Sequence, residues 1–381
     1  MKFSIIYEAQ MVDTSRASEL RCFRETVEQS LYAEEMGFDT IWAVEHTSLT
    51  QYAHMSTPET FLAFLAGKTK RIHIGHGVVC LPFRQNHPIK VAERIAMLDI
   101  LSEGRLHFGM GKGGTDQEIG AFGTPPATLQ QECDEAMYMI PEMWKDGDFS
   151  YKSDLITIPP RPIWPKPYSD PHPPMYLASS REQSLIDAGS RGLGSLVLGF
   201  AGPDEIARKN AIYRKAFRER DPKRQVGYRP IEHLAALCPA VVLDDGEKAR
   251  QIGFRGQRFF AEAIQHWYAG GPPPRSHDLS AEEQKREFES EKEAFVAHLH
   301  EEKIPVNDAA TGLFNVDHAY GTPDRAIAYV QRLIDAGADE ILFMFQMGTI
   351  PHEAAMETIR NVGKYVIPHF RRQGSAKRVA E

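Results

Sequence analysis

The stretch Thr40-Ile41-Trp42-Ala43-Val44-Glu45-His46 joins an apolar, β-rich run to an acid and a histidine. The run predicts a strand, and Met36-Gly37 just before it predicts the end of the preceding helix. Parallel α/β proteins build their sites at the carboxyl ends of strands. The stretch therefore predicts an α/β fold with Glu45 and His46 at a candidate site. The alternative is that Glu45 caps a helix and His46 is an ordinary polar loop residue.

The same strand-then-helix rhythm recurs along the chain. Apolar, β-rich runs predict eight strands, at Phe3–Tyr7, Thr40–Val44, Ile72–Leu81, Leu106–Met110, Met175–Leu177, Ser195–Leu198, Leu234–Val242 and Glu340–Phe345. Amphipathic stretches between them predict helices, at Ser18–Met36, Pro58–Lys68, Pro88–Leu101, Leu129–Trp144, Pro203–Arg218 and Pro323–Ala336. Alternation at this spacing indicates a parallel sheet, and eight units favour a closed (β/α)8 TIM barrel over a doubly wound sheet.

The chain is predicted to form one barrel domain, residues 1–373, with a carboxyl-terminal tail at 374–381. Two insertions interrupt its rhythm, at about 149–174 and 253–317. The first is rich in proline and aromatic residues, which is typical of an extended segment leading to the fifth strand.

The second insertion is predicted to be a mobile cover over the barrel mouth. Its pair Gly270-Gly271 would act as a hinge, and residues 278–302 carry nine acidic and three basic side chains. A helix of this composition offers little apolar surface with which to dock permanently. If the insertion is no cover, we expect it to make subunit contacts.

Composition excludes several classes of protein. Of 381 residues, 42% are hydrophobic, and no apolar run approaches the roughly 18 residues that span a membrane. No basic stripe marks a nucleic-acid surface. The amino terminus is too brief an apolar run for a signal peptide, so we expect a cytoplasmic protein. Cys22, Cys80, Cys133 and Cys238 are widely spaced, so we expect free thiols and no metal site.

A glycine-rich turn, Gly109-Met110-Gly111-Lys112-Gly113-Gly114, follows the fourth predicted strand and matches the pattern GxGxxG. A dinucleotide fingerprint would follow the first strand of its unit, with an acid about 20 residues later at the end of a strand. Here Asp134 lies within a helical pattern instead. The other interpretation is a turn whose glycines let backbone N–H groups approach a phosphate while Lys112 supplies charge.

A second polar segment, Ala178-Ser179-Ser180-Arg181-Glu182-Gln183-Ser184, links the fifth strand to a helix. Its hydroxyls are ordinary helix caps in one interpretation. In the other, the helix amino terminus forms an anion site with Ser180, Arg181 and Ser184. Two such segments at one rim indicate a phosphate-bearing cofactor more strongly than either segment does alone.

The third predicted strand, within Ile74-Gly75-His76-Gly77-Val78-Val79-Cys80-Leu81-Pro82, contains glycines where strands usually avoid them. Glycine in a strand often marks the close approach of a ligand or an unusual backbone. On residue type and position alone, His76 is expected to be a core histidine.

Together, the Glu45-His46 pair and the glycine-rich turn resemble those of the bacterial luciferase-like family of flavin-dependent monooxygenases. The resemblance covers most of the chain and implies a TIM barrel. It implies catalytic roles for His46 and Glu45, with the histidine assisting formation and protonation of a flavin peroxide. It implies a non-proline cis peptide at Gly77-Val78, against which the flavin ring rests. Luciferase carries a reactive cysteine where this chain has Gly111, so light emission is not implied, and glycine would leave more room over the flavin.

The resemblance also assigns the remaining site residues. It implies an FMN phosphate held by the segments that contain Gly111, Lys112, Gly113, Ser179, Ser180, Arg181 and Ser184. The segment Phe345-Gln346-Met347-Gly348-Thr349 resembles the last strand of the family, which implies that Gln346 and Met347 line the substrate pocket together with His76.

The resemblance implies that the protein is an FMN-dependent monooxygenase. Reduced FMN would come from a separate NAD(P)H-dependent reductase and react with O2 to form a flavin C4a-peroxide, which oxygenates a small organic substrate. We expect a homodimer. One alternative is a deazaflavin-dependent hydride-transfer oxidoreductase on the same barrel. Another is a non-catalytic flavin-binding subunit.

Overall fold

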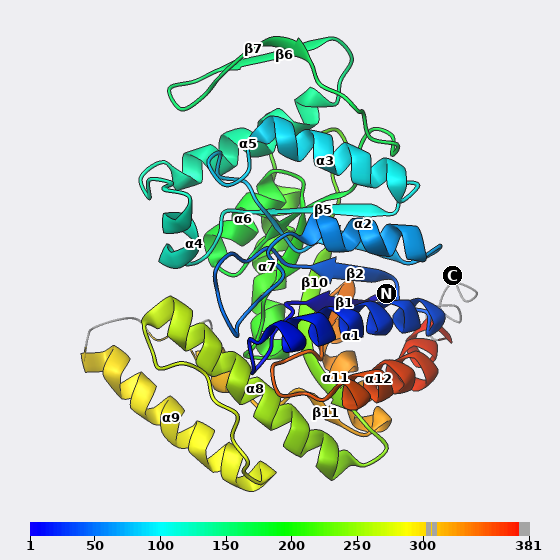
Figure 1. The fold of residues 1–381 in the computed structure, drawn as a ribbon, viewed down its shortest axis with the longest axis vertical. Helices are drawn as coiled ribbons and strands as arrows, with labels where there is room; N and C mark the ends of the chain where they lie inside the picture. The colour runs from blue at the N-terminus through cyan, green and yellow to red at the C-terminus, as the bar shows by residue number, and fades with distance from the viewer. Residues whose placement is uncertain (302–305, 307–310, 373–381) are drawn as a thin grey trace.

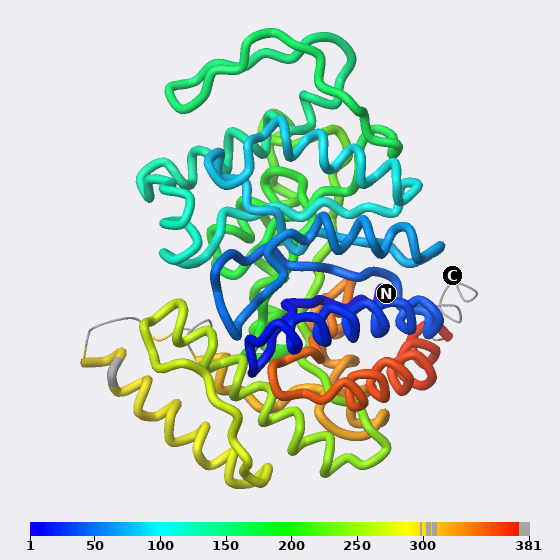
Figure 2. Tube along the Cα trace, in the orientation of Figure 1, coloured from blue at the N-terminus to red at the C-terminus, as the bar shows by residue number. Residues whose placement is uncertain are grey.

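The computed structural model describes residues 1–301, 306 and 311–372, and its centre is a closed barrel of parallel strands (Figures 1 and 2). Around the barrel the strands follow the order β1 (Lys2–Tyr7), β2 (Thr40–Ala43), β3 (His73–His76), β5 (Leu106–Gly111), β8 (Met175–Ala178), β9 (Gly194–Val197), β10 (Leu234–Val242) and β12 (Glu340–Met344). Lys2 of β1 pairs with Glu340 of β12, which closes the ring. The predicted eight-stranded TIM barrel is confirmed.

Helices follow the strands and cover the outside of the barrel. They are α1 (Arg16–Glu35), α2 (Pro58–Lys68), α3 (Pro88–Leu101), α4 (Asp116–Ala121), α5 (Leu129–Met143), α6 (Glu182–Ser190), α7 (Pro203–Arg218), α11 (Pro323–Asp335) and α12 (His352–Asn361). Proline occupies the first turn of α2, α3, α7 and α11, where its missing N–H costs no hydrogen bond. The six predicted helices lie within two residues of these bounds.

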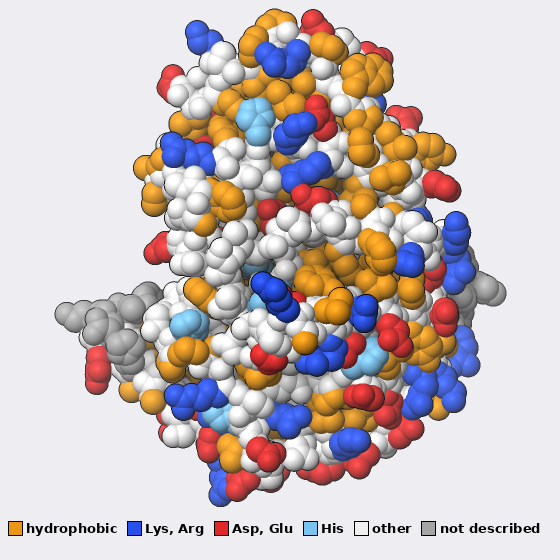
Figure 3. Space-filling model, viewed as in Figure 1, with side chains coloured by type: hydrophobic (Ala, Val, Ile, Leu, Met, Phe, Trp, Pro, Cys, Tyr) orange, Lys and Arg blue, Asp and Glu red, His pale blue; other side chains and the backbone are white. Residues whose placement is uncertain are grey.

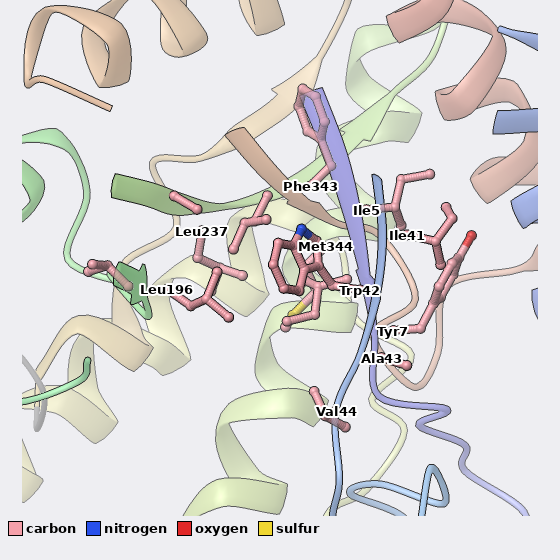
Figure 4. Close-up of a cluster of buried hydrophobic side chains, with 14 of the residues drawn as sticks. Ile5, Tyr7, Ile41, Trp42, Ala43, Val44, Leu196, Leu237, Phe343 and Met344 are labelled. Atoms are coloured by element: carbon pink, nitrogen blue, oxygen red, sulfur yellow. The ribbon is translucent and has the colours of Figure 1, made fainter. Parts of the chain in front are cut away.

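The floor of the barrel is a packed cluster of aromatic and polar side chains around Trp42. Its indole Nε1 donates to Glu340 (2.9 Å), and its ring contacts His107 and Tyr176. Figure 4 shows Trp42 on one side of its strand beside Met344, with Tyr7 on the other side. The amino-terminal half of the interior is therefore filled, which leaves the carboxyl-terminal mouth for a site.

The third strand is interrupted, whereas the sequence predicted one run over Ile72–Leu81. β3 ends at His76, the Gly77–Val78 peptide is cis, and β4 (Val79–Cys80) resumes the pairing with β5. The expected cis peptide is thus present. Packing explains the glycine at position 75, because a Cβ there would lie 2.4 Å from the Trp42 ring.

The first insertion is a hairpin rather than a simple extended segment. β6 (Asp148–Lys152) pairs with β7 (Thr157–Pro162) in antiparallel fashion, and Figure 1 shows the pair projecting beyond α3 and α5. The remainder of the insertion then leads to β8, as predicted.

The second insertion begins later than the sequence predicted, because α8 (Gly246–Ala269) runs unbroken through Gly253. The glycines in this helix serve close packing. A Cβ on Gly253 would lie 2.5 Å from the Tyr320 ring, and one on Gly256 would lie 2.8 Å from Ile350. Gly270, with a left-handed φ of 70°, ends the helix.

The acidic helix of this insertion, α9 (Ala281–Glu301), is docked, contrary to the expectation of little docking surface. The buried guanidinium of Arg258 on α8 binds Glu287 and Glu291, and the buried ring of Phe288 contacts Phe314 edge-on. Figure 1 shows α9 on the outer side of α8. The predicted tail at 374–381 and residues 302–305 and 307–310 lie outside the described part of the chain.

A search of the described residues finds no helix with the length and apolarity of a membrane span. The same part of the chain contains no group of His, Cys, Asp and Glu side chains placed to hold a metal ion. All four cysteines are buried free thiols.

Candidate active site

His46 lies just beyond β2 between two carboxyl groups at the barrel mouth. Its Nδ1 is 2.8 Å from Oε1 of Glu118, and its Nε2 is 3.7 Å from Oε2 of Glu8. Both acids are almost fully buried, whereas 17% of the His46 side chain is exposed. Glu8 directly follows β1, and Glu118 lies in α4 after β5, so three strand ends bring the cluster together.

Glu118 is held in place by the start of its own helix. Thr115 caps α4: its hydroxyl accepts from the N–H of Glu118, whose carboxylate in turn accepts from the backbone and hydroxyl of Thr115. The N–H of Thr47 also donates to Oε1 of Glu118 (3.3 Å). This capping box fixes the carboxylate and therefore the orientation of the imidazole.

The cluster shifts the pKa of each member. Burial alone would lower the pKa of His46, but its hydrogen bond with Glu118 and the charges of Glu8 and Glu118 raise it above 6.5. Burial would raise the pKa of Glu118, but His46 lowers it below its usual value. Burial raises the pKa of Glu8 to about 7. These shifts favour the ion pair between His46 and Glu118 and favour the protonated form of Glu8.

Glu45 makes its hydrogen bonds away from His46. Its Oε2 accepts from the backbone N–H of Cys80 (2.8 Å), and its Oε1 accepts from the amide of Asn86 (2.9 Å). Glu45 supports the backbone of β4, and the acid paired with His46 is Glu118.

The two predicted phosphate segments lie side by side. Met110 of β5 is paired with Leu177 of β8, so the turns that follow these strands meet at one rim. Lys112 is exposed and bonds Gln130, and Arg181 is exposed at the start of α6. The hydroxyl of Ser179 donates to the carbonyls of Leu177 and Ser184. The hydroxyl of Ser184 donates to the carbonyl of Arg181 and accepts from its N–H, so Ser184 takes part in capping α6. Ser180 is exposed.

Gly111 does not leave open space, contrary to expectation. A Cβ there would lie 2.5 Å from Cγ2 of Val78, so the valine side chain fills the volume in front of Gly111. Gly113 differs, because it has a φ of 84° and the nearest atoms to a Cβ would be 3.9 Å away. The open part of the turn is therefore at Gly113.

The three residues expected to line the substrate pocket lie away from His46. His76 is buried against Phe108 on the helix side of the barrel, and burial lowers its pKa to about 3, so it is a neutral core residue. Gln346 donates to the hydroxyl of Thr26 on α1 (2.7 Å). Met347 is fully buried, and its carbonyl approaches Gly256 of α8.

Helix α8 crosses the mouth and supplies an aromatic cover. Phe260 contacts Tyr52, whose ring packs against His46 with 5.2 Å between centroids. Trp267 donates to the carbonyl of Thr50 (3.0 Å), and Tyr268 contacts Tyr52 and lies over Gly114. In the described residues, the part of the predicted insertion that reaches the His46 cluster is the end of α8, and its role as a mobile cover stays a prediction.

Sequence reasoning missed Glu8, Glu118, Tyr52 and Tyr268. Two of them carry a local signal. Glu8 follows an apolar strand-like run as His46 does, and the pattern Thr115-x-x-Glu118 marks a capped helix directly after the glycine-rich turn. The two tyrosines carry none, because their place depends on packing between distant segments.

Residues 1–340 match the family described as luciferase-like monooxygenase, so the chain belongs to that family. Over 211 residues it is 30% identical to the oxygenase component of a flavin-dependent trigonelline monooxygenase from Acinetobacter baylyi, a match that covers 55% of this chain and 57% of the relative. Over 325 residues it is 23% identical to an F420-dependent glucose-6-phosphate dehydrogenase from Amycolatopsis mediterranei, covering 84% and 88% of the two chains.

The monooxygenase RslO1 from Streptomyces bottropensis has a similar solved structure. The TM-score is 0.74 at 24% identity, with 97% of this chain and all of that chain covered. This likeness supports the barrel assignment. Family membership defines the protein as an oxidoreductase of the flavin-dependent kind, whose relatives include monooxygenases and F420-dependent dehydrogenases.

Proposed function

We propose that the protein is an FMN-dependent monooxygenase that inserts one atom of O2 into a small organic substrate. The observation that carries this proposal is the buried Glu8–His46–Glu118 cluster, which stands beside a turn suited to phosphate. The likeness to a flavin-dependent monooxygenase oxygenase component supports it.

The hydrogen-bond donors and the positive charges at the rim fit the phosphate of FMN. The first N–H groups of α6 have no partner within their helix, and a helix amino terminus attracts anions. Lys112, Arg181 and Ser180 can add charge and a hydroxyl, and the open turn at Gly113 admits a close ligand. Ser184 and Ser179 support this rim by shaping the turn.

Bound reduced FMN supplies the electrons that activate O2. The chain then has to manage protons and exclude water. Glu118 favours the protonated form of His46, so the imidazole is suited to donate a proton from Nε2 into the mouth. Glu8, whose pKa burial raises to about 7, lies 3.7 Å from that nitrogen and is suited to restore its proton.

Helix α8 excludes water from the mouth in this proposal. Tyr52 packs against His46, and Phe260 and Tyr268 of α8 pack against Tyr52 in turn. A dry mouth favours oxygen transfer to substrate over release of hydrogen peroxide.

The experiment that tests the function is a substrate screen with reduced FMN supplied chemically. Aldehydes, cyclic ketones, aromatic compounds and amines are tested for products heavier by one oxygen atom. Oxygen uptake without any such product across the screen would contradict the proposal. A protein without oxygen uptake would be either a non-catalytic flavin-binding subunit, against which the intact His46 cluster counts, or an enzyme that uses a different flavin.

The second candidate is deazaflavin-dependent hydride transfer, supported by the likeness to an F420-dependent dehydrogenase along most of the chain. Reconstitution with FMN and with F420, followed by absorbance and fluorescence of the retained cofactor, separates the two. Retention of FMN with oxygen-dependent turnover supports the monooxygenase.

We further propose the partners that this chemistry requires. A separate NAD(P)H-dependent reductase delivers reduced FMN, and a second copy of the chain covers α2 and α3. Figure 3 shows hydrophobic side chains gathered over these helices, where Phe64, Met97 and Leu101 are each more than half exposed. An exposed apolar patch of this kind is typical of subunit contacts.

A further inference from the structure

The short strand β4 has a neighbouring strand on only one of its edges. β2 pairs with β3 as far as Ala43 and His76. Beyond that point, in the described part of the chain, β4 pairs with β5 alone, with Cys80 opposite Gly111. The donor to the carbonyl of Gly111 is the N–H of Leu81 (2.9 Å). The backbone of Cys80 therefore needs partners on its other side.

The side chains of Glu45 and Asn86 take the place of the missing strand. Oε2 of Glu45 accepts from the N–H of Cys80 (2.8 Å), and Nδ2 of Asn86 donates to the carbonyl of Cys80 (2.8 Å). The same Nδ2 also donates to Oε1 of Glu45 (2.9 Å), which closes a ring of hydrogen bonds around one residue of β4. Cys80 and Asn86 are both buried, so loss of the amide would remove the donor of a buried carbonyl.

Arg94 on α3 fixes the orientation of the Asn86 amide. Its Nη2 donates to Oδ1 of Asn86, which directs Nδ2 toward Glu45 and Cys80. Its Nη1 forms an ion pair with Glu59 on α2, so two outer helices hold the guanidinium. An unbroken series of contacts thus runs from these helices to the backbone of β4.

The backbone that these contacts hold also carries the side chain in front of Gly111. Val78 directly precedes β4, and its Cγ2 fills the volume that a Cβ on Gly111 would occupy. Gly111 in turn precedes Lys112, the cation of the proposed phosphate turn. A shift of Cys80 would therefore move Val78 relative to this turn.

We propose that Asn86 and Arg94 are positioning residues for the flavin site, which hold Val78 in place against the glycine-rich turn by fixing β4. The inference rests on the proposed function, because it requires that the flavin lies beside Val78. Both residues act on the flavin only through the backbone. Their loss should therefore change the wall of the site and leave the phosphate donors Lys112 and Arg181 in place.

Methyl NMR of the full chain without ligand tests the positioning on its own. The Val78 methyl resonances should shift in Arg94→Met and return toward the wild-type position in Arg94→Lys, because lysine keeps a donor for Asn86. Lys90→Met, at an exposed position of the same helix, should leave them unchanged. Asn86→Ala should cause a larger shift, and the partly exposed Arg94 keeps the test readable if that variant does not fold. Unshifted Val78 methyls in Arg94→Met would overturn the proposal.

Fluorescence titration with FMN and riboflavin tests the link to the flavin. Arg94→Met should weaken both ligands by a similar factor, about tenfold, because the ligand must then hold the wall that the side chains held before. Arg94→Lys should restore both affinities. Weakening of FMN alone, or unchanged affinity for both, would overturn the link. A wild-type protein that binds neither ligand would contradict the proposed function, while the Val78 resonances still decide the positioning.

Discussion

Glu118 follows His46 by 72 residues, yet its Oε1 lies 2.8 Å from Nδ1 of the imidazole. The contact joins the end of β2 to the helix after the glycine-rich turn. It links the candidate proton donor to the same segment that carries Lys112, so both parts of the proposed site depend on one short stretch after β5.

Replacing His46 with alanine should leave the fold intact and reduce product formation by at least ~10²-fold, the usual scale for a general acid-base group. His46 is at the mouth and packs only one face against Tyr52. Thermal melting and product yield with supplied reduced FMN measure the two effects. Turnover at the wild-type rate would rule out the role.

Glu118→Gln should lower the pKa of His46. Glutamine can keep the capping box with Thr115 but removes the negative charge that raises the imidazole pKa. A histidine with a raised pKa stays protonated to higher pH, so the alkaline limb of the activity profile should move to lower pH in the variant. NMR titration of His46 in both proteins provides the direct measurement, and an unmoved pKa would contradict the ion pair.

The double variant Lys112→Ala with Arg181→Ala should weaken FMN binding more than riboflavin binding. Each charge-assisted bond to phosphate contributes about 1.5 to 3 kcal/mol, which is roughly tenfold or more in affinity. Fluorescence titration with both ligands gives the comparison. Lys90→Ala, an exposed lysine on α3, is the matched control. Equal weakening of FMN and riboflavin would place the phosphate elsewhere.

Tyr268→Ala should raise the ratio of hydrogen peroxide released to product formed. The change removes the side chain that contacts Tyr52 and lies over Gly114, so water reaches the mouth. Tyr365→Ala, an exposed tyrosine next to α12, should keep the wild-type ratio. If the two variants give the same ratio as the wild type, α8 is no cover.

Phe64→Glu combined with Leu101→Glu should convert a dimer to a monomer. Two charges would be desolvated in an apolar contact, which is costly. Sedimentation velocity reports the mass, and Leu20→Glu, on an exposed position of α1, serves as the control. A mass unaffected by the double variant would show that α2 and α3 lie outside any subunit contact.

The barrel could be predicted because its signals are local. The predicted strands are short apolar runs, and α2, α3, α7 and α11 begin at a proline that the sequence displays. The predicted start of the second insertion at Gly253 was wrong for a physical reason. Glycine usually weakens a helix, but here the absence of a Cβ lets α8 approach Tyr320. Close packing of distant segments is not visible from the residue type.

The candidate site was only partly predictable. The position of His46 after an apolar run indicates a candidate site residue, and the strand order brings the turns after β5 and β8 side by side. The phosphate role of these turns stays a prediction. The resemblance implies catalytic roles for the adjacent pair Glu45 and His46, and the sequence carries no sign of which acid contacts the imidazole. The structure instead uses Glu8 and Glu118, which are close only after the barrel closes.

Gly111 and Val78 occupy one shared volume between neighbouring strands, since a Cβ at 111 would meet the valine methyl at 2.5 Å. The sizes of the side chains at positions 78 and 111 are therefore coupled: a larger side chain at one position requires a smaller one at the other. A side chain can be gained on β5 only where one is lost from the segment joining β3 to β4. Redesign of this wall has to exchange atoms between the two sites, as Val78→Gly with Gly111→Ala does, because either change alone leaves a hole or a clash.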